Sequence, residues 1–170
     1  WFRVPDKELY RLTTNYSTVN GSLIPIDPPA GSVYSDPPAF PFGGSGLVSS
    51  PRDYDRFLKM VAGYGAIDGK RVIGEQAVRT GTSDLLPNPD AVKGTLVEGH
   101  GFGAGGQVGW AGAPRAYGWA GAANTFGIAD MESGLRVGLY TQYAAPPPTS
   151  LYTDSLQAIG KDFALQKVTR

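Results

Sequence analysis

The sequence offers few side chains for nucleophilic or metal chemistry. It contains one histidine, His100, and no cysteine, which removes thiolate nucleophiles and thiolate metal ligands together. A Ser-His-Asp triad is possible by residue type, but the glycines on both sides of His100 supply no carboxylate to orient its ring. We therefore expect His100 at the surface or at a strand edge. No metal-binding motif is present, so the sequence predicts no metal and no cofactor.

Two other patterns are compatible with chemistry, and both have a structural explanation. Residues 101–106 match the dinucleotide-binding pattern G-x-G-x-x-G, which requires a helix to open directly after it. The glycines and the proline of residues 107–114 cannot open that helix, so we predict closely packed glycine-rich strands. The acidic pair Asp53 and Asp55 is predicted to be solvated, because nothing nearby in the sequence would desolvate one carboxylate and raise its pKa.

Composition and charge restrict the class of protein. The chain has 170 residues, and 15 Lys and Arg balance 15 Asp and Glu, so the formal net charge is zero. A neutral chain has no bulk charge for a nucleic acid, so no such partner is predicted. No apolar run approaches the roughly 18 residues that a membrane span needs. We expect a soluble protein with a core, in the cytoplasm or in the periplasm or outside the cell.

Four stretches with different residue patterns predict how the chain is organised. Residues 1–48 are rich in proline and glycine, and they should run extended over a surface that they cannot supply themselves. Residues 49–95 should form helices and a loop. Residues 96–145 should form sheet strands, and residues 149–166 a C-terminal helix. Together these stretches predict an α+β fold in which helices flank an antiparallel sheet.

The helix that begins near residue 51 has the clearest boundaries. Ser50 can cap it and Pro51 suits its first turn, while Gly63 can end it. Four side chains recur at helical spacing and should form its buried face: Tyr54, Phe57, Leu58 and Val61. A second, shorter helix is predicted around residues 75–80.

Alternating apolar residues later in the chain predict a β-hairpin. Residues 126–130 and 135–141 alternate like strands on either side of a turn at Glu132-Ser133-Gly134, and Asp130 and Glu132 flank that turn. Thr149 or Ser150 can cap the last helix. We expect four of its side chains to face inward: Leu151, Leu156, Ile159 and Phe163.

An ordered set of segments resembles a known family. In chain order, the segments are 43–57 with its helix, 101–103, 117–123, 130–134 and 140–142. This order resembles the C-terminal half of serine β-lactamase-fold hydrolases, and it is most similar to the class C β-lactamase-like carboxylesterases, the family VIII esterases. The likeness covers most of residues 1–165. It implies that residues 1–170 form the C-terminal part of one β-lactamase-like domain.

In that family, three motifs build the site: Ser-x-x-Lys, a Tyr-x-Asn loop, and Lys-Thr-Gly or a substitute on a strand. By resemblance, Trp119-Ala120-Gly121 takes the third place, where esterase-like members often carry Trp-Gly-Gly. The resemblance then implies that the backbone N–H of Ala122 is one of two oxyanion-hole donors, with Trp119 and Gly121 beside it. The substrate-binding residues that it implies are Tyr117, Trp119, Ala120 and Asn124.

The first two motifs are absent from this sequence. No Ser is followed by Lys three positions later, and no Tyr is followed by Asn two positions later. The nucleophile and base are therefore not in this chain. We expect a complementary N-terminal polypeptide to carry them, because the chain starts at Trp1 and residues 1–48 lack a supporting surface. The competing explanation is a degenerate relative without catalysis.

The resemblance implies a serine hydrolase that cleaves carboxylic esters through an acyl-enzyme, and we expect this chain alone to be inactive. A β-lactamase or D-alanyl peptidase of the same fold is the enzyme alternative. Trp119 offers an apolar face where a Lys would attract a substrate carboxylate, so neutral esters are favoured. The alternative from another class is a non-catalytic binding module.

Overall fold

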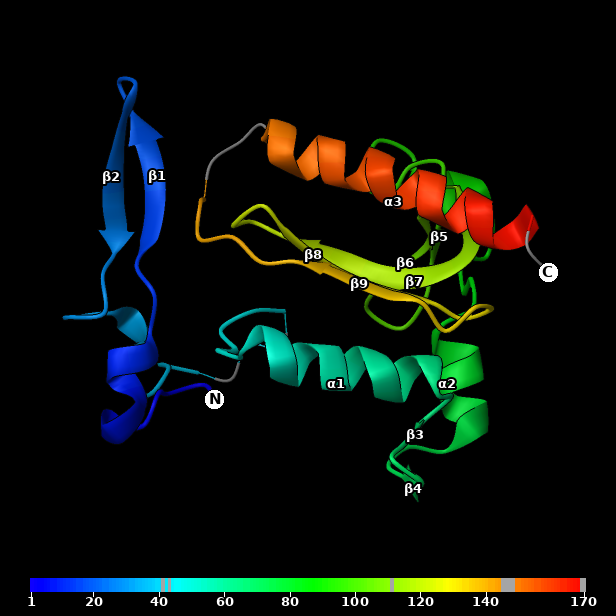
Figure 1. Cartoon of the computed structure of the whole chain (residues 1–170), viewed down its shortest axis with the longest axis horizontal. Helices are drawn as coiled ribbons and strands as arrows, with labels where there is room; N and C mark the ends of the chain where they lie inside the picture. Colours follow the sequence, from blue (N-terminus) through cyan, green and yellow to red (C-terminus); the bar gives the residue numbers. More distant parts are fainter. Residues whose placement is uncertain (41, 43, 111, 145–148, 169–170) are drawn as a thin grey trace.

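A five-stranded antiparallel sheet forms the centre of the molecule, with its strands in the order β5-β6-β7-β8-β9. The computed structural model describes residues 1–40, 42, 44–110, 112–144 and 149–168, and the side chains up to residue 161. The sheet strands are β5 (Gly101–Phe102), β6 (Gln107–Trp110), β7 (Ala113–Gly121), β8 (Thr125–Asp130) and β9 (Arg136–Leu139). Helix α1 (Pro51–Ala62) lies on one face and helix α3 (Ser150–Val168) on the other, so the predicted α+β architecture is confirmed (Figure 1).

Two apolar clusters fill the layers on either side of the sheet. The cluster on the α3 side is built around Phe126 and Ile128 of β8, and the cluster on the α1 side around Ala129 and Leu58. Successive residues of β8 thus alternate between the two faces, as a pleated strand requires. Because both faces are covered, β8 is buried along most of its length.

Helix α1 begins and ends where the sequence predicts. The N–H of Asp53 donates to Ser50 Oγ at 3.1 Å, Pro51 occupies the first turn, and Gly63 follows the last residue. Leu58 and Val61 are buried as expected. Phe57 is 46% exposed, which corrects its expected place on the buried face.

The inward face of α1 is displaced from the predicted one because α1 contacts β8 and β9 on one side and the shorter elements after it on the other. Met60 is buried there in place of Phe57. Tyr54 lies against Gly127 of β8, where a Cβ atom would come within 2.3 Å of the tyrosine ring. Only glycine permits this close approach.

An ion pair joins α1 to the last strand. Arg136 Nε donates to Asp55 Oδ1 at 2.9 Å, and Nη2 of the same guanidinium donates to Oδ2 at 3.3 Å. This hydrogen-bonded guanidinium lowers the pKa of Asp55 below its ordinary value. The prediction of a solvated Asp55 is therefore right in part, since its side chain is half exposed but paired.

We expect Asp55→Asn to destabilise the complete protein by less than about 1 kcal/mol near neutral pH, because the pair is partly exposed. Since the folded-state pKa of Asp55 is lowered, its contribution is present above the unfolded pKa of about 4 and is lost as pH falls through the folded value. Urea unfolding at about pH 7 and about pH 3 measures this. An equal difference between variant and wild type at both pH values would contradict the assignment.

Between α1 and the sheet, short elements follow the predicted order. The strands β3 (Ala66–Ile67) and β4 (Lys70–Arg71) form a small hairpin, and α2 (Glu75–Gly81) corresponds to the predicted second helix. A 3₁₀ turn, η3 (Pro89–Val92), lies in the loop after it. Residues 96–100 form turns instead of the expected strand, and His100 is exposed among them, as predicted.

The N-terminal segment is only partly extended. It contains two 3₁₀ turns, η1 (Asp6–Arg11) and η2 (Val33–Ser35), and a hairpin of β1 (Asn15–Val19) and β2 (Ser22–Asp27). The strands of the hairpin are extended as expected, but their pairing with each other was not predicted. Its turn is Asn20-Gly21, with both φ angles positive, which is the strongest short-range hairpin signal in a sequence.

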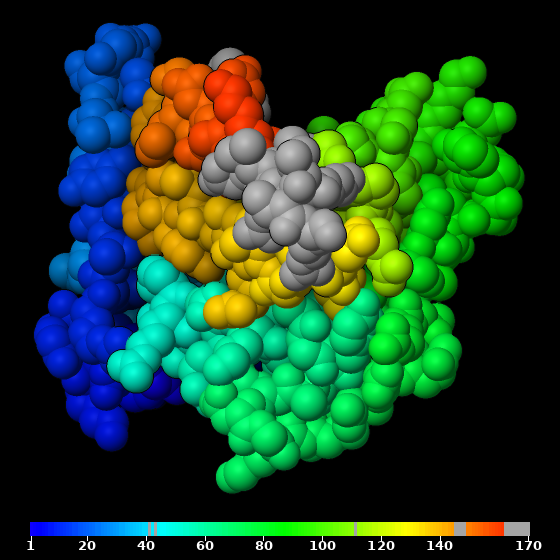
Figure 2. All heavy atoms as spheres, turned by 45° about the vertical axis from the view of Figure 1, so that its right-hand side comes forward, coloured from blue at the N-terminus to red at the C-terminus, as the bar shows by residue number. Residues whose placement is uncertain are grey.

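This hairpin is attached to the main body by a few polar contacts. The N–H of Tyr16 donates to the carbonyl of Gln142 at 2.8 Å, and the N–H of Ala144 donates to the carbonyl of Tyr16 at 2.8 Å. The hydroxyl groups of Thr18 and Tyr143 form a hydrogen bond, with 2.7 Å between their oxygen atoms. In Figure 2 the segment forms a ridge along one side of the molecule. The hairpin exposes four apolar side chains on its two faces: Val19, Leu23, Ile24 and Ile26.

The C-terminal helix packs through one narrow stripe. Ile159 is buried, Leu156 packs beside it, and the ring of Tyr152 meets Phe126 edge-on with 5.4 Å between centroids. Leu151 is 55% exposed, so its predicted inward position is wrong. Tyr152, one residue and about 100° further around the helix, takes the inward place. Phe163 lies outside the described side chains.

No helix in the described part of the chain combines the length and the apolar character that crossing a membrane requires.

Candidate active site

The segment Trp119-Ala120-Gly121 forms the end of strand β7, directly before the turn that leads to β8. Trp119 pairs with Gly127, and Gly121 pairs with Thr125. Trp119 therefore shares a face with Gly127, which is the face covered by α1. Ala120 points to the opposite face and packs against the cluster under α3. Its predicted role as a substrate contact has no support from this placement, because its side chain belongs to the core.

Trp119 forms an exposed aromatic surface at this end of the sheet. Its side chain is 41% exposed, and the ring of Phe102 meets the indole edge-on at 5.7 Å between centroids. Edge-to-face pairs of this kind hold both rings in place. Phe102 was not predictable as a site residue, because nothing local in the sequence connects β5 to the end of β7.

A loop carboxylate fixes the position of Phe102. Asp84 Oδ1 accepts from the N–H of Phe102 at 3.0 Å and from the N–H of Leu86 at 3.1 Å. Gly101 lies so close that a Cβ atom would be 2.8 Å from the carboxylate carbon. The contact from Asp84 to Leu86 is an Asx turn, which the sequence could have suggested. Its contact with Phe102 spans 18 residues and had no local signal.

Tyr117 lies on the same face as Trp119 but supports a loop. Its hydroxyl donates to the carbonyl of Ala104 at 2.7 Å, and its ring covers Gly106, where a Cβ atom would come within 2.6 Å. Burial raises the pKa of Tyr117, so the phenol stays protonated at neutral pH. These contacts give Tyr117 a positioning role for the glycine-rich loop, and confirm that residues 101–106 pack closely instead of opening a helix.

The turn from β7 to β8 consists of residues 122–124 and exposes Ala122 at its start. Asn124 closes it in the left-handed conformation, with φ of 57°. Thr141 Oγ1 donates to the carbonyls of Ala123 and Asn124. Thr141 thus fixes the second half of the turn. Ala122, whose N–H is the predicted oxyanion-hole donor, is exposed at the start of the turn.

Asn124 anchors this turn instead of lining a pocket. The residue is 5% exposed. Its Nδ2 donates to the carbonyl of Tyr143 at 2.9 Å, and its Oδ1 accepts from the N–H of Thr149 at 2.8 Å. Its expected substrate contact therefore has no support from the structure. Its preference for positive φ and its two-sided hydrogen bonding were the signals for an anchor.

No nucleophile with a base is found among the described residues. None of the serines there bonds to a histidine or a lysine. Ser133, in the hairpin turn of β8 and β9, donates to Asp130, whose carboxylate also accepts from the N–H groups of residues 132 and 133. Asp130 is buried, and its carboxylate holds the turn that the sequence predicts it to flank.

Two pockets among the described residues lie away from Trp119, which lines neither of them. One of about 240 Å³ lies between α2 and the first half of β7, and the other of about 310 Å³ lies beside the end of α1. The end of β7 carries the partly exposed ring of Trp119 and the exposed turn residue Ala122. No group of three or more His, Cys, Asp or Glu suited to a metal occurs in the part of the chain described.

A family model described as Beta-lactamase matches residues 1–160, which include the whole sheet, α1 and the Trp119-Ala120-Gly121 segment. The chain belongs to the beta-lactamase family. Within this family, the antiparallel sheet between α1 and α3 and the hairpin at the end of β7 are parts of a common fold, and the fold expected from the ordered segments is confirmed.

Solved structures support the same fold at low sequence identity. A Simvastatin Synthase (LovD) mutant from Aspergillus terreus superimposes with a TM-score of 0.71 at 20% identity over 97% of this chain. EstCE1, a hydrolase with promiscuous acyltransferase activity, gives 0.68 at 18% identity over 92%. A penicillin-binding protein homologue from Caulobacter crescentus gives 0.57 at 17% identity over 92%.

This beta-lactamase-family chain spans less than half of each of those structures: 44%, 45% and 46% of their lengths, respectively. A curated relative, Protein Rv1367c of Mycobacterium tuberculosis, is 41% identical over 56 residues, which are 33% of this chain and 14% of that protein. The match with the known structures thus covers nearly all of this chain, including its sheet. More than half of each known structure lies outside the match.

Proposed function

We propose that this chain supplies one side of the active site of a serine hydrolase that cleaves carboxylic esters through an acyl-enzyme. The observation that carries the proposal is the exposed turn after Trp119-Ala120-Gly121, with Ala122 at its open side and Asn124 anchoring it from below. Membership of the beta-lactamase family supports serine chemistry. The likeness to EstCE1 and LovD favours acyl transfer from esters.

In the proposed reaction, a serine oxygen outside this chain attacks the ester carbonyl. The carbonyl oxygen gains negative charge, and the N–H of Ala122 and the amide of the nucleophile donate hydrogen bonds to it. Collapse of this intermediate breaks the bond to the alcohol, which leaves with a proton from the neighbouring base. Water then attacks the acyl-enzyme and releases the carboxylic acid, with the serine regaining its proton.

Trp119 directs this site toward uncharged substrates. Its half-exposed indole, held by Phe102, presents a flat apolar face beside the turn. A lysine in its place would attract a carboxylate on the substrate, as a β-lactam carries, whereas the indole offers no charge to pair with it. Neutral esters of small acids are therefore the proposed substrates.

The nucleophile would come from a complementary polypeptide that completes the domain. Within the described residues, β9 pairs with β8 alone, so its second edge has free backbone donors and acceptors. The exposed apolar residues of the β1–β2 hairpin add further surface suited to burial. More than half of each similar structure lies outside the match, which is enough chain to cover both.

Activity-based labelling of the complete protein tests the proposal. A fluorophosphonate should label the assembly on a serine outside this chain, and a short-chain p-nitrophenyl ester should be hydrolysed faster than a cephalosporin. Trp119→Lys should shift this ratio toward the cephalosporin by at least about tenfold, because it introduces a charge for the substrate carboxylate. Absence of labelling would reject the enzyme, and a preference for the cephalosporin in the wild type would favour a β-lactamase.

A further inference from the structure

A second candidate site lies toward the start of β7, beside α2, and Trp119 is not among its lining residues. Its pocket has a volume of about 240 Å³ and is lined by Tyr64, Arg79, Thr82, Ser83, Val108, Pro114, Arg115 and Met131. Arg115 lies near the start of β7, six residues before Gly121, which is about 20 Å of extended strand. The pocket is therefore distinct from the proposed ester site.

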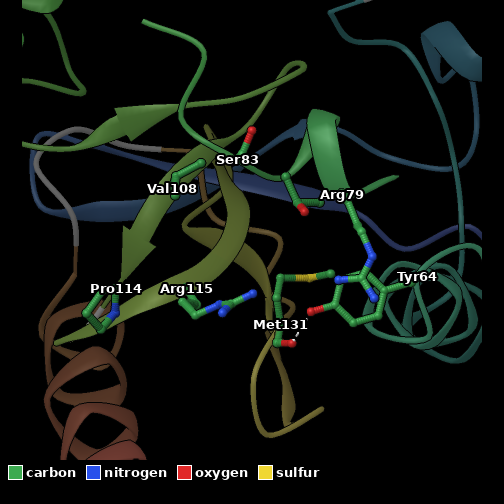
Figure 3. Close-up of a pocket in the computed structure, with 8 residues that line it drawn as sticks. Tyr64, Arg79, Ser83, Val108, Pro114, Arg115 and Met131 are labelled. Carbon is green, nitrogen blue, oxygen red and sulfur yellow. Dashed lines mark hydrogen bonds between the residues drawn. The ribbon is translucent and has the colours of Figure 1, made fainter. Parts of the chain in front are cut away.

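Two guanidinium groups enter this pocket, and no acidic side chain lines it. In Figure 3 the side chain of Arg115 extends toward Met131, and Arg79 reaches the ring of Tyr64 from the other side. Two cations around one small pocket repel each other unless an anion lies between them. The charge pattern thus favours an anionic ligand.

The two arginines differ in how much of their charge is already neutralised. Arg79 donates to Glu75 through Nε at 2.8 Å and Nη2 at 2.6 Å, and its guanidinium carbon lies 3.9 Å from the centroid of the Tyr64 ring. Arg115 has an exposed side chain with no hydrogen bond or ion pair to any residue in the described part of the chain. All its N–H donors are therefore available, and Arg79 forms a fixed second wall.

The rest of the pocket is lined mainly by apolar and aromatic side chains. Tyr64 donates its hydroxyl to the carbonyl of Met131 at 2.6 Å, which joins the loop after α1 to the end of β8. Val108 and Pro114 supply aliphatic surface. The hydroxyls of Thr82 and Ser83 already donate to carbonyls of α2, so they do not compete for the anion as donors.

From this arrangement we propose that the pocket binds a small organic carboxylate, with Arg115 holding the carboxylate and the apolar walls holding its hydrocarbon part. The planar guanidinium matches a carboxylate with two parallel hydrogen bonds. The volume is below the roughly 300 Å³ at which pockets for drug-sized ligands begin, so the ligand has few heavy atoms. The proposal is independent of the proposed ester hydrolysis.

Calorimetric titration of the complete protein with sodium benzoate tests this site. Arg115→Gln should weaken benzoate binding at least about tenfold, because it removes charge-assisted hydrogen bonds. Arg115→Lys, which keeps the charge but not the two-pronged geometry, should give an intermediate affinity. Arg52→Gln is the matched control on the exposed surface of α1 and should leave the affinity unchanged. Equal affinity in wild type and Arg115→Gln would overturn the proposal.

Three further arms establish the location and the ligand class. Trp119→Ala should leave benzoate binding unchanged, and its loss in that variant would place benzoate at the ester site and overturn the proposal. Benzyl alcohol, which has the same ring without the charge, should bind at least about tenfold more weakly. Inorganic phosphate bound as tightly as benzoate would overturn the assignment to an organic carboxylate, since the apolar walls would then contribute nothing.

Discussion

Ala122→Pro is expected to lower kcat for ester hydrolysis by the complete protein about 10²–10³-fold, which is the usual cost of losing one oxyanion-hole donor. Proline has no N–H, so the substitution removes the proposed donor without adding a charge. The first position of a turn suits the fixed φ of proline, and Gly121 before it tolerates the restriction that proline imposes on its neighbour. The fold should therefore survive.

Initial rates with a p-nitrophenyl ester, together with the thermal midpoint of each variant, measure this effect. Ala122→Ser is the matched control, because it keeps the N–H and adds only a small side chain, and its kcat should stay within about tenfold of the wild type. A proline variant that folds and turns over like the wild type would show that the N–H of Ala122 does not stabilise the oxyanion. A large loss in both variants would indicate a steric effect instead.

Gly118→Ala should cause the largest loss of stability, about 3 kcal/mol in the free energy of unfolding. Gly118 pairs with Ile128 across β7 and β8. A Cβ atom on Gly118 would lie 2.1 Å from the carbonyl oxygen of Gly127 and 2.9 Å from the Cα of Ile128. Both atoms belong to the backbone of β8, so the whole strand must move and disturb both apolar clusters.

Urea unfolding of the complete protein, followed by circular dichroism, measures this loss. Gly74→Ala is the matched control because Gly74 has a φ of −58° and an added Cβ would meet nothing within 4 Å. We expect its free energy of unfolding to fall by only about 1 kcal/mol, the usual difference between a favoured N-cap residue and alanine. Equal midpoints for the two variants would contradict the close approach of β7 and β8.

Elements with strong local signals were predicted well from the sequence. Ser50, Pro51 and Gly63 bound α1 as their capping preferences require, and the turn at residues 132–134 joins β8 to β9. The β1–β2 hairpin had an equally local signal in Asn20-Gly21, which was overlooked in favour of the prolines around it. Because Asn-Gly favours the positive φ angles of a two-residue turn, this hairpin was predictable from the sequence.

Only the position of the candidate site, at the end of a strand and in the turn after it, was predictable from the sequence pattern. The end of β7 and its turn are at the expected positions, and the oxyanion role of Ala122 stays a prediction. Phe102 and Asp84 were missed because their contacts join segments that are distant in sequence. Asn124 was expected at the substrate but is buried, because its backbone angle and its amide together suit an anchor.

The hydrogen bonds of Asn124 mechanically couple the proposed catalytic turn to a distant helix. Its side-chain amide donates to the carbonyl of Tyr143, four residues after β9, and accepts from the N–H of Thr149, directly before α3. A shift of α3 along its axis would therefore pull on the turn that presents Ala122. We expect substitutions on α3 that touch no substrate to alter the rate of the proposed hydrolysis through this turn.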